Sequence, residues 1–156
     1  MNSLRETSPN WHLALRRYIL ASGALHFVWE IAQLPLYTIW TEPIGRKAFA
    51  VLHCTVGDLM IAGISLLLTL AVIGKADWPR SGSRPVCQLL IFLGAGYTIY
   101  GEWLNVNVRG SWAYSSLMPT LPVIGTGLAP LLQWLLVPTA ATGIAVGRAP
   151  WSDERN

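Results

Sequence analysis

Residues 25–37, LHFVWEIAQLPLY, carry His26, Glu30 and Gln33 inside a segment that is otherwise apolar enough to cross a membrane. An ionisable side chain in hydrocarbon costs from about a few kcal/mol upward, so such a residue normally faces the interior of a helix bundle and has a function. The three residues lie at positions i, i+4 and i+7, on one face of an α-helix. We therefore expect a helix whose polar stripe faces other helices.

The composition is that of an integral membrane protein. Of 156 residues, 53% are hydrophobic and 12% are charged, and the mean hydropathy is +0.43, so charges are too few to cover a soluble globule. A helix needs about 20 residues to cross the hydrocarbon of a bilayer. Four apolar segments approach or exceed that length: 17–40, 48–74, 86–107 and 121–146. They predict an all-α, polytopic four-helix bundle that forms one transmembrane domain, residues 1–156.

The basic residues predict the orientation. If four helices alternate in direction, three basic residues fall on one side: Arg46, Lys47 and Arg109. The other side receives Arg5, Arg16, Arg17, Lys75, Arg80, Arg84, Arg148 and Arg155. The positive-inside rule then places both termini in the cytoplasm. We expect localisation in the cell membrane, which is the inner membrane in a bacterium, and no surface for nucleic acid.

Prolines predict irregular helices in two of the apolar segments. Pro35 lies in the first segment, and three prolines recur every eight residues through the last: Pro122, Pro130 and Pro138. Each proline removes a backbone N–H donor, so we expect kinks or local opening at these positions.

The two cysteines, Cys54 and Cys87, stand alone in the sequence. No CxxC spacing is present, which argues against a disulfide, a zinc site or a redox pair. We expect both to be packed thiols without chemical function.

Ionisable residues also occur in the second and third apolar segments. His53 and Asp58 lie in the second, and in the third Glu102, Asn105 and Arg109 repeat a helical spacing. A rise of about 1.5 Å per residue places these groups, with His26 and Glu30, in the outer half of the membrane. The sequence therefore predicts a polar pocket inside an apolar bundle.

A structural role and a chemical role both account for any single one of these residues. A carboxylate can pair with a neighbour such as Arg109 to hold helices together, and a lone histidine is usually a packing residue. Three acids and two histidines, however, exceed what is needed to join four helices. Acid and base groups together can move a proton onto and off a substrate. Five aromatic residues could stabilise a positive centre nearby: Trp29, Trp103, Trp134, Tyr97 and Tyr100.

Several short motifs resemble the EXPERA group of four-helix membrane domains, the group of the sterol Δ8–Δ7 isomerase and the sigma-two receptor. HFVWE at 26–30 is similar to its His-x-x-x-Glu, and Gly57–Asp58 follows at a similar interval, 32 residues from His26 to Asp58. IYGEWL at 99–104 resembles I-Y-G-D-x-L, and QWLLVP at 133–138 resembles Trp-x-x-x-Pro. The group's G-D-S-R-Y reads GDLMI in this chain.

The resemblance implies that His26 and Glu30 form the acid/base edge of the pocket. Asp58 and Glu102 would be polar supports or proton partners, and Trp134 would face a cationic intermediate. The reaction in that group protonates a ring double bond and removes a proton elsewhere, and it needs no cofactor.

We therefore expect a small membrane enzyme or lipid-binding protein that carries out isomerase-like proton transfer on an isoprenoid, sterol-like or other apolar lipid. The expected catalytic residues are His26, Glu30, Asp58 and Glu102. The expected substrate-binding residues are Trp29, Gln33, His53, Tyr97, Tyr100, Asn105 and Trp134. No metal or other cofactor is expected, and assembly as a homodimer stays open.

Three other classes of function stay open. A proton-coupled transporter can use an intramembrane glutamate. A haem or metal protein could use His26 and His53, although axial haem ligands must face each other across the iron. The chain could also be an accessory subunit of a membrane complex.

Overall fold

The computed structural model describes residues 10–73 and 78–147, and within these ranges the chain is helical without named strands. The elements in chain order are α1 (Trp11–Gln33), η1 (Leu34–Leu36), η2 (Thr38–Thr41), α2 (Ile44–Ile73), α3 (Ser83–Glu102), η3 (Trp103–Arg109) and α4 (Leu128–Val146). Both η1 and η2 are 3-10 turns, whereas η3 is a π-helix. The predicted all-α architecture with four main helices is confirmed for this part of the chain. Four basic residues used above for the orientation lie outside the described residues: Arg5, Lys75, Arg148 and Arg155.

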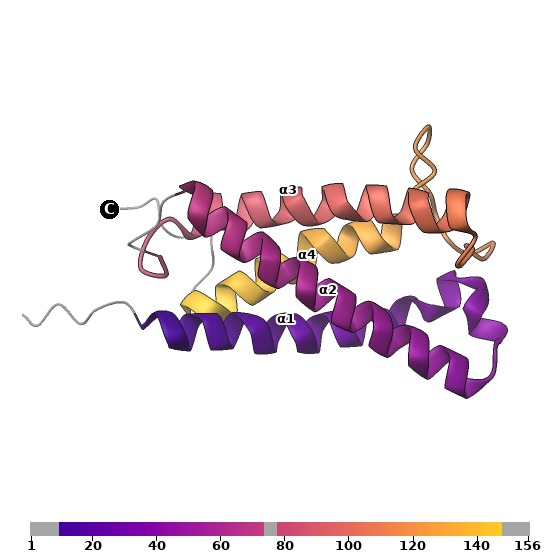
Figure 1. Ribbon diagram of the computed structural model, residues 1–156, viewed down its shortest axis with the longest axis horizontal. Coiled ribbons are helices and arrows are strands. Elements are labelled where there is room, and N and C mark those ends of the chain that lie inside the picture. The colour runs from indigo at the N-terminus through magenta and orange to yellow at the C-terminus, as the bar shows by residue number, and fades with distance from the viewer. Residues whose placement is uncertain (1–9, 74–77, 148–156) are drawn as a thin grey trace, which may run out of the picture.

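The helices form an antiparallel bundle. α1 packs against α2 and α4, and α3 packs against the same two helices, so α1 and α3 occupy opposite corners. Figure 1 shows α2 running obliquely across the other helices. We call the end where α1 and α3 end, and where α2 and α4 begin, the cavity end of the bundle.

The first helix ends earlier than the sequence predicted. The expected helix over 17–40 stops at Gln33, and two 3-10 turns follow it. Pro35 explains the stop, because its ring clashes with the preceding turn and it offers no N–H. The same helix begins six residues early, at Trp11, where the Asn10 side chain accepts a hydrogen bond from the Leu13 N–H at 3.1 Å.

The last helix begins later than the sequence predicted, at Leu128 instead of 121. Pro122 therefore lies in the connection before α4 and kinks no helix. Val123 and Gly125 have left-handed backbone angles, φ 77° and 69°, which end any regular element there. Pro130 lies in the first turn of α4, where a missing N–H costs little, whereas Pro138 lies inside the helix as expected.

The apolar core fills the end of the bundle opposite the cavity end. It draws mainly on the first halves of α1 and α3 and the second halves of α2 and α4. Its buried members are Ala14, Tyr18, Ala62, Leu66, Trp78, Val86, Leu90, Trp134, Ala141 and Ala145. Trp134 is the member nearest the cavity end. Gly94 lets the indole of Trp134 lie directly against the backbone of α3, where an added Cβ would overlap it.

Among the described residues, three helical segments are long and apolar enough to cross a membrane: Trp11–Leu36, Ile44–Ile73 and Leu128–Val146. The sequence had predicted four. With 20 residues α3 is long enough, but its polar residues, among them Arg84, Gln88 and Glu102, lower its hydropathy.

Candidate functional site

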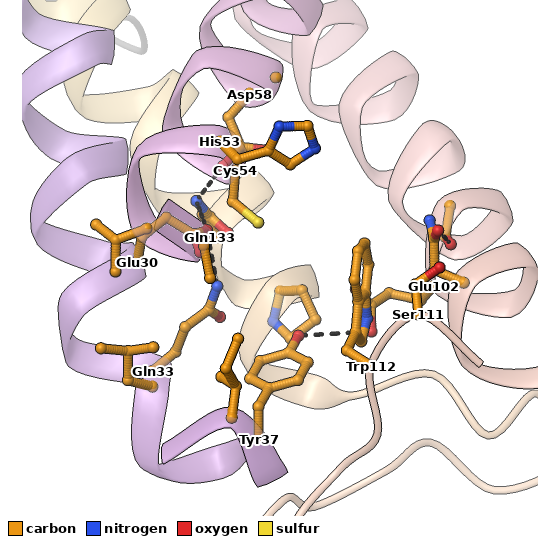
Figure 2. A pocket seen from close by; sticks show the side chains of 18 of the residues that line it. Glu30, Gln33, Tyr37, His53, Cys54, Asp58, Glu102, Ser111, Trp112 and Gln133 are labelled. Carbon is orange, nitrogen blue, oxygen red and sulfur yellow. Dashed lines mark hydrogen bonds between the residues drawn. The ribbon is translucent and has the colours of Figure 1, made fainter. Parts of the chain in front are cut away.

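A cavity of about 1040 Å³ lies at the cavity end of the bundle. All four main helices contribute to its wall, together with residues 111 and 112 of the connection before α4. Its wall mixes apolar and aromatic side chains with polar groups, as ligand sites do. Figure 2 shows the polar groups converging on it from α1, α2, α3 and α4.

Gln133 of α4 is the centre of the polar cluster. Its Nε2 lies 2.8 Å from Nδ1 of His26, 2.9 Å from Oδ2 of Asp58 and 3.2 Å from Oε1 of Glu30. An amide nitrogen carries two hydrogens, so it cannot donate to all three acceptors at once. A proton on one of the acceptors cannot be shared with the amide nitrogen, which only donates, but His26 Nδ1 and Asp58 Oδ2 lie 3.4 Å apart and can share one.

Three further contacts fix the geometry of this cluster. Gln33 Nε2 donates to Glu30 Oε1 at 2.8 Å, and Trp29 Nε1 donates to Gln33 Oε1 at 3.2 Å. His26 Nδ1 also lies 3.4 Å from Asp58 Oδ2. The predicted polar stripe of α1 is therefore one connected set, and Asp58 joins it from α2.

Burial separates the members of the cluster into two layers. His26 is fully buried and lies behind the cavity wall. Its ring packs against Trp134 in a tilted arrangement, with the ring centroids 5.1 Å apart. Glu30 and Asp58 line the cavity, and the Asp58 side chain is 16% exposed. A guest in the cavity can thus meet the two carboxyl groups, whereas the imidazole can act only through them.

Glu102 forms a second polar group on the opposite wall. Its Oε2 accepts hydrogen bonds from the hydroxyls of Tyr37, at 3.5 Å, and Tyr114. Tyr114 in turn accepts from the Gly127 N–H at 2.9 Å. Burial, and next the bond to Glu102, raise the pKa of Tyr114 above its ordinary value, so its hydroxyl remains a donor.

Backbone hydrogen bonds hold the connection before α4 against the turns η1 and η2 that follow α1. Thr38 N donates to Ala113 O at 2.9 Å, and Ser115 N donates to Leu36 O at 2.9 Å. Tyr37 and Tyr114 pair at this junction as an isolated antiparallel bridge. Backbone hydrogen bonds of the neighbouring residues thus hold in place the two tyrosines that contact Glu102.

The structure places most of the remaining predicted site residues on the cavity wall. Tyr97, Asn105 and Trp134 line it, as does the exposed His53, whose ring stacks on Phe49 with centroids 5.5 Å apart. Tyr100 and Trp29 do not line this cavity. Tyr100 is 56% exposed beside Trp103, and Trp29 reaches the site only through Gln33.

Sequence reasoning missed three residues that organise the site: Gln133, Tyr37 and Tyr114. A glutamine inside an otherwise apolar helix is a detectable signal, because it needs a partner there. The tyrosines carry no such signal in their local sequence. Of the two free cysteines, Cys54 lines the cavity and Cys87 is buried with its Sγ 3.8 Å from Thr139 Oγ1.

The two histidines of the haem alternative occupy different surroundings. His26 is buried against Gln133 and Trp134, whereas His53 is exposed beside Phe49. Within residues 10–73 and 78–147, no group of three or more His, Cys, Asp or Glu side chains is arranged to hold a metal ion.

Comparison of the chain with family models, curated proteins and solved structures gives no match. The resemblance to the EXPERA group therefore stays a prediction.

Proposed function

We propose that this chain is an integral membrane protein that binds a lipid in the cavity and transfers protons to and from it through Glu30 and Asp58. The observation that carries the proposal is the shared contact of these two carboxyls and His26 with one amide nitrogen on the wall of a cavity of about 1040 Å³.

Membrane insertion is supported by the outside of the bundle. Large apolar side chains are exposed along the helices, among them Leu20, Val28, Leu67, Val72 and Phe92. An apolar outer face is expected where lipid is the solvent. By the sequence, eight of the eleven basic residues, among them Arg16, Arg17 and Arg84, belong to the end opposite the cavity end, and the positive-inside rule assigns that end to the cytoplasm. The cavity then opens in the outer half of the bilayer.

The proposed reaction is the migration of a carbon–carbon double bond. The protonated carboxyl of the pair donates its proton to one carbon of the double bond, which leaves a carbocation on the other. The ionised carboxyl then removes a proton from a carbon next to the cation, and the electrons of that C–H bond form the new double bond. One proton enters the product and one returns to the pair, so the formula is unchanged. Trp134 and Tyr97 line the same cavity and can face the cation.

His26 has a supporting role in this proposal. Its Nδ1 lies against both Gln133 and Asp58 from behind the wall, so it helps to hold these two side chains in place. We regard it as a positioning residue, and Glu102, held by two tyrosines, as a fixed part of the opposite wall.

Deuterium uptake tests the proposal on a mixture of lipids, so the substrate need not be identified first. The full chain is reconstituted in vesicles made from a total membrane lipid extract in D₂O, and the lipids are analysed by mass spectrometry for deuterium in C–H positions. We expect incorporation with the native chain and none with Glu30→Gln or Asp58→Asn. Glu42→Gln, an exposed carboxyl outside the cavity, is the matched control. Equal incorporation by the native chain and Glu30→Gln would refute the mechanism.

Proton-coupled transport is a second candidate. It is favoured by buried hydroxyls between the polar cluster and the end of the bundle opposite the cavity. Ser22, Thr69 and Thr142 are buried on three different helices, and the side-chain oxygen of Thr69 has no hydrogen-bond partner in the described part of the chain. By their positions along the helices, they lie between the cluster and the end opposite the cavity. Acidification of vesicles that depends on both Glu30 and Thr142 would support this candidate in place of isomerisation.

A further inference from the structure

Two arginines mark the mouth of the cavity. Arg46 lies in the first turn of α2, and Arg109 is the last residue of η3. Both line the cavity, and both are exposed. The mouth is therefore positively charged, whereas the inner wall carries the carboxyls of Glu30, Asp58 and Glu102.

The arginines are separated from the acids along the bundle axis. Arg46 precedes Asp58 by twelve residues of the same helix, which corresponds to about 18 Å at 1.5 Å per residue. Arg109 likewise follows Glu102 by seven residues. The cavity thus has a basic mouth and an acidic interior with apolar surface between them, including Phe49 and Tyr97.

Both arginines can bind a further anion. Arg46 lies 3.9 Å from Glu42, but that pair is exposed, with the two side chains 74% and 48% accessible, so it adds little stability. Arg109 makes no ion pair with any residue in the ranges that the structure describes. A guanidinium is a planar donor fork that matches the geometry of phosphate or carboxylate.

We propose that the guest is an amphiphile with an anionic headgroup, a phosphate monoester or a carboxylate, bound between Arg46 and Arg109. Its apolar chain runs inward past Phe49 and Tyr97 to the wall formed by Glu30 and Asp58. This assignment rests on the proposed function, which places the reaction at Glu30 and Asp58. It adds the chemical class of the substrate. A neutral, sterol-like molecule would leave Arg109 without an ionic partner and Arg46 with only the exposed Glu42.

Three probes of equal chain length test the headgroup: dodecyl phosphate, dodecanoate and dodecanol. The full chain in lipid nanodiscs is titrated with each, and the bound complexes are counted by native mass spectrometry. At least one anionic probe should bind tenfold or more tightly than dodecanol. A preference for dodecyl phosphate assigns a phosphate headgroup, and a preference for dodecanoate assigns a carboxylate.

The double variant Arg46→Gln/Arg109→Gln should lose this preference. The matched control is Arg16→Gln/Arg17→Gln, which removes the same charge from exposed positions at the other end of the bundle and should keep it. Equal affinity for all three probes, or a preference that survives the mouth variant, would overturn the assignment. Neither result affects the deuterium test of the proposed function, because that test depends on Glu30 and Asp58.

Discussion

Gln133 on α4 and Asp58 on α2 are hydrogen-bonded at 2.9 Å across the interior of the bundle, between two helices that each pack mainly against α1 and α3. The amide of Gln133 also reaches acceptors on α1. One neutral side chain thus joins three helices, and it does so at the wall of the cavity.

The first prediction concerns this amide. Gln133→Leu removes the shared donor from two buried or half-buried carboxyls and His26, and an unsatisfied buried polar group costs about 1–3 kcal/mol, more when charged. We expect a loss of at least about 3 kcal/mol in unfolding free energy, measured by denaturation in mixed micelles. Gln33→Leu, which removes one donor to Glu30, is the control and should cost less. Equal losses for the two variants would show that Gln133 is not the centre of the network.

The second prediction concerns the contact between Gly94 and Trp134. A Cβ at Gly94 overlaps the indole, and overpacking of this kind typically costs about 1–3 kcal/mol. Gly94→Ala should therefore lower the melting temperature and also displace His26, on which Trp134 stacks.

Gly96→Ala is the matched control two residues away. A Cβ there meets nothing within 4 Å, so the alanine should be neutral or stabilise the helix by up to about 1 kcal/mol. Trp134→Leu should remove most of the penalty of Gly94→Ala in the double variant. Equal stability of the Gly94→Ala and Gly96→Ala variants would contradict the close contact between α3 and the indole of Trp134.

Parts of the site that depend on periodicity were predictable from the sequence. His26, Glu30 and Gln33 share a face because they belong to one helix, and a polar stripe among apolar residues is expected to face other helices. Asp58 and Glu102 were expected to join them because the helical rise per residue places them at a similar depth along the bundle. Both acids do line the cavity, although Glu102 lies with the tyrosines and apart from the Gln133 cluster.

The parts that depend on pairing between distant segments were not predictable. Gln133 is a single polar residue without a stripe, so nothing local shows that it faces α1 and α2. Tyr114 reaches Glu102 only because the connection before α4 folds back onto residues 36 and 38. The start of α4 was misplaced because the apolar residues 121–124 continue the hydropathy of the helix, while the backbone there turns.

The third prediction concerns the bond between Tyr114 and Glu102. Tyr114→Phe removes the donor to Glu102 and the acceptor for the Gly127 N–H. The buried Gly127 N–H is thereby left without its acceptor, and an unsatisfied buried donor costs about 1–3 kcal/mol. Hydrogen exchange at Gly127 should therefore accelerate about tenfold or more. Tyr100→Phe, whose ring is exposed away from this cavity, should leave that exchange unchanged.

The pH dependence of the same bond has a definite sign. Because the folded protein raises the pKa of Tyr114, the neutral phenol is favoured by folding. Its contribution is complete below the ordinary tyrosine pKa, about 10, and declines only as the pH rises through the folded value. Protection of Gly127, corrected for intrinsic exchange, should be constant from neutral pH to about pH 10. A decline between neutral pH and pH 9 would contradict this assignment.

The last prediction concerns a buried hydroxyl that has no partner in the described part of the chain. Thr69 is fully buried in α2, and its Oγ1 makes no hydrogen bond there. Such a group costs about 1–3 kcal/mol relative to an apolar group of the same shape. Thr69→Val should therefore raise stability in denaturation by SDS.

Thr55 on the same helix is the counterpart, because its hydroxyl donates to Val51 O at 2.7 Å. Thr55→Val should be neutral or destabilising, so only the substitution at Thr69 is expected to raise stability. Destabilisation by Thr69→Val would instead mean that the hydroxyl has a partner such as ordered water. Water bound at the buried hydroxyls is what a proton path through the bundle would need, so this result would favour the transport candidate.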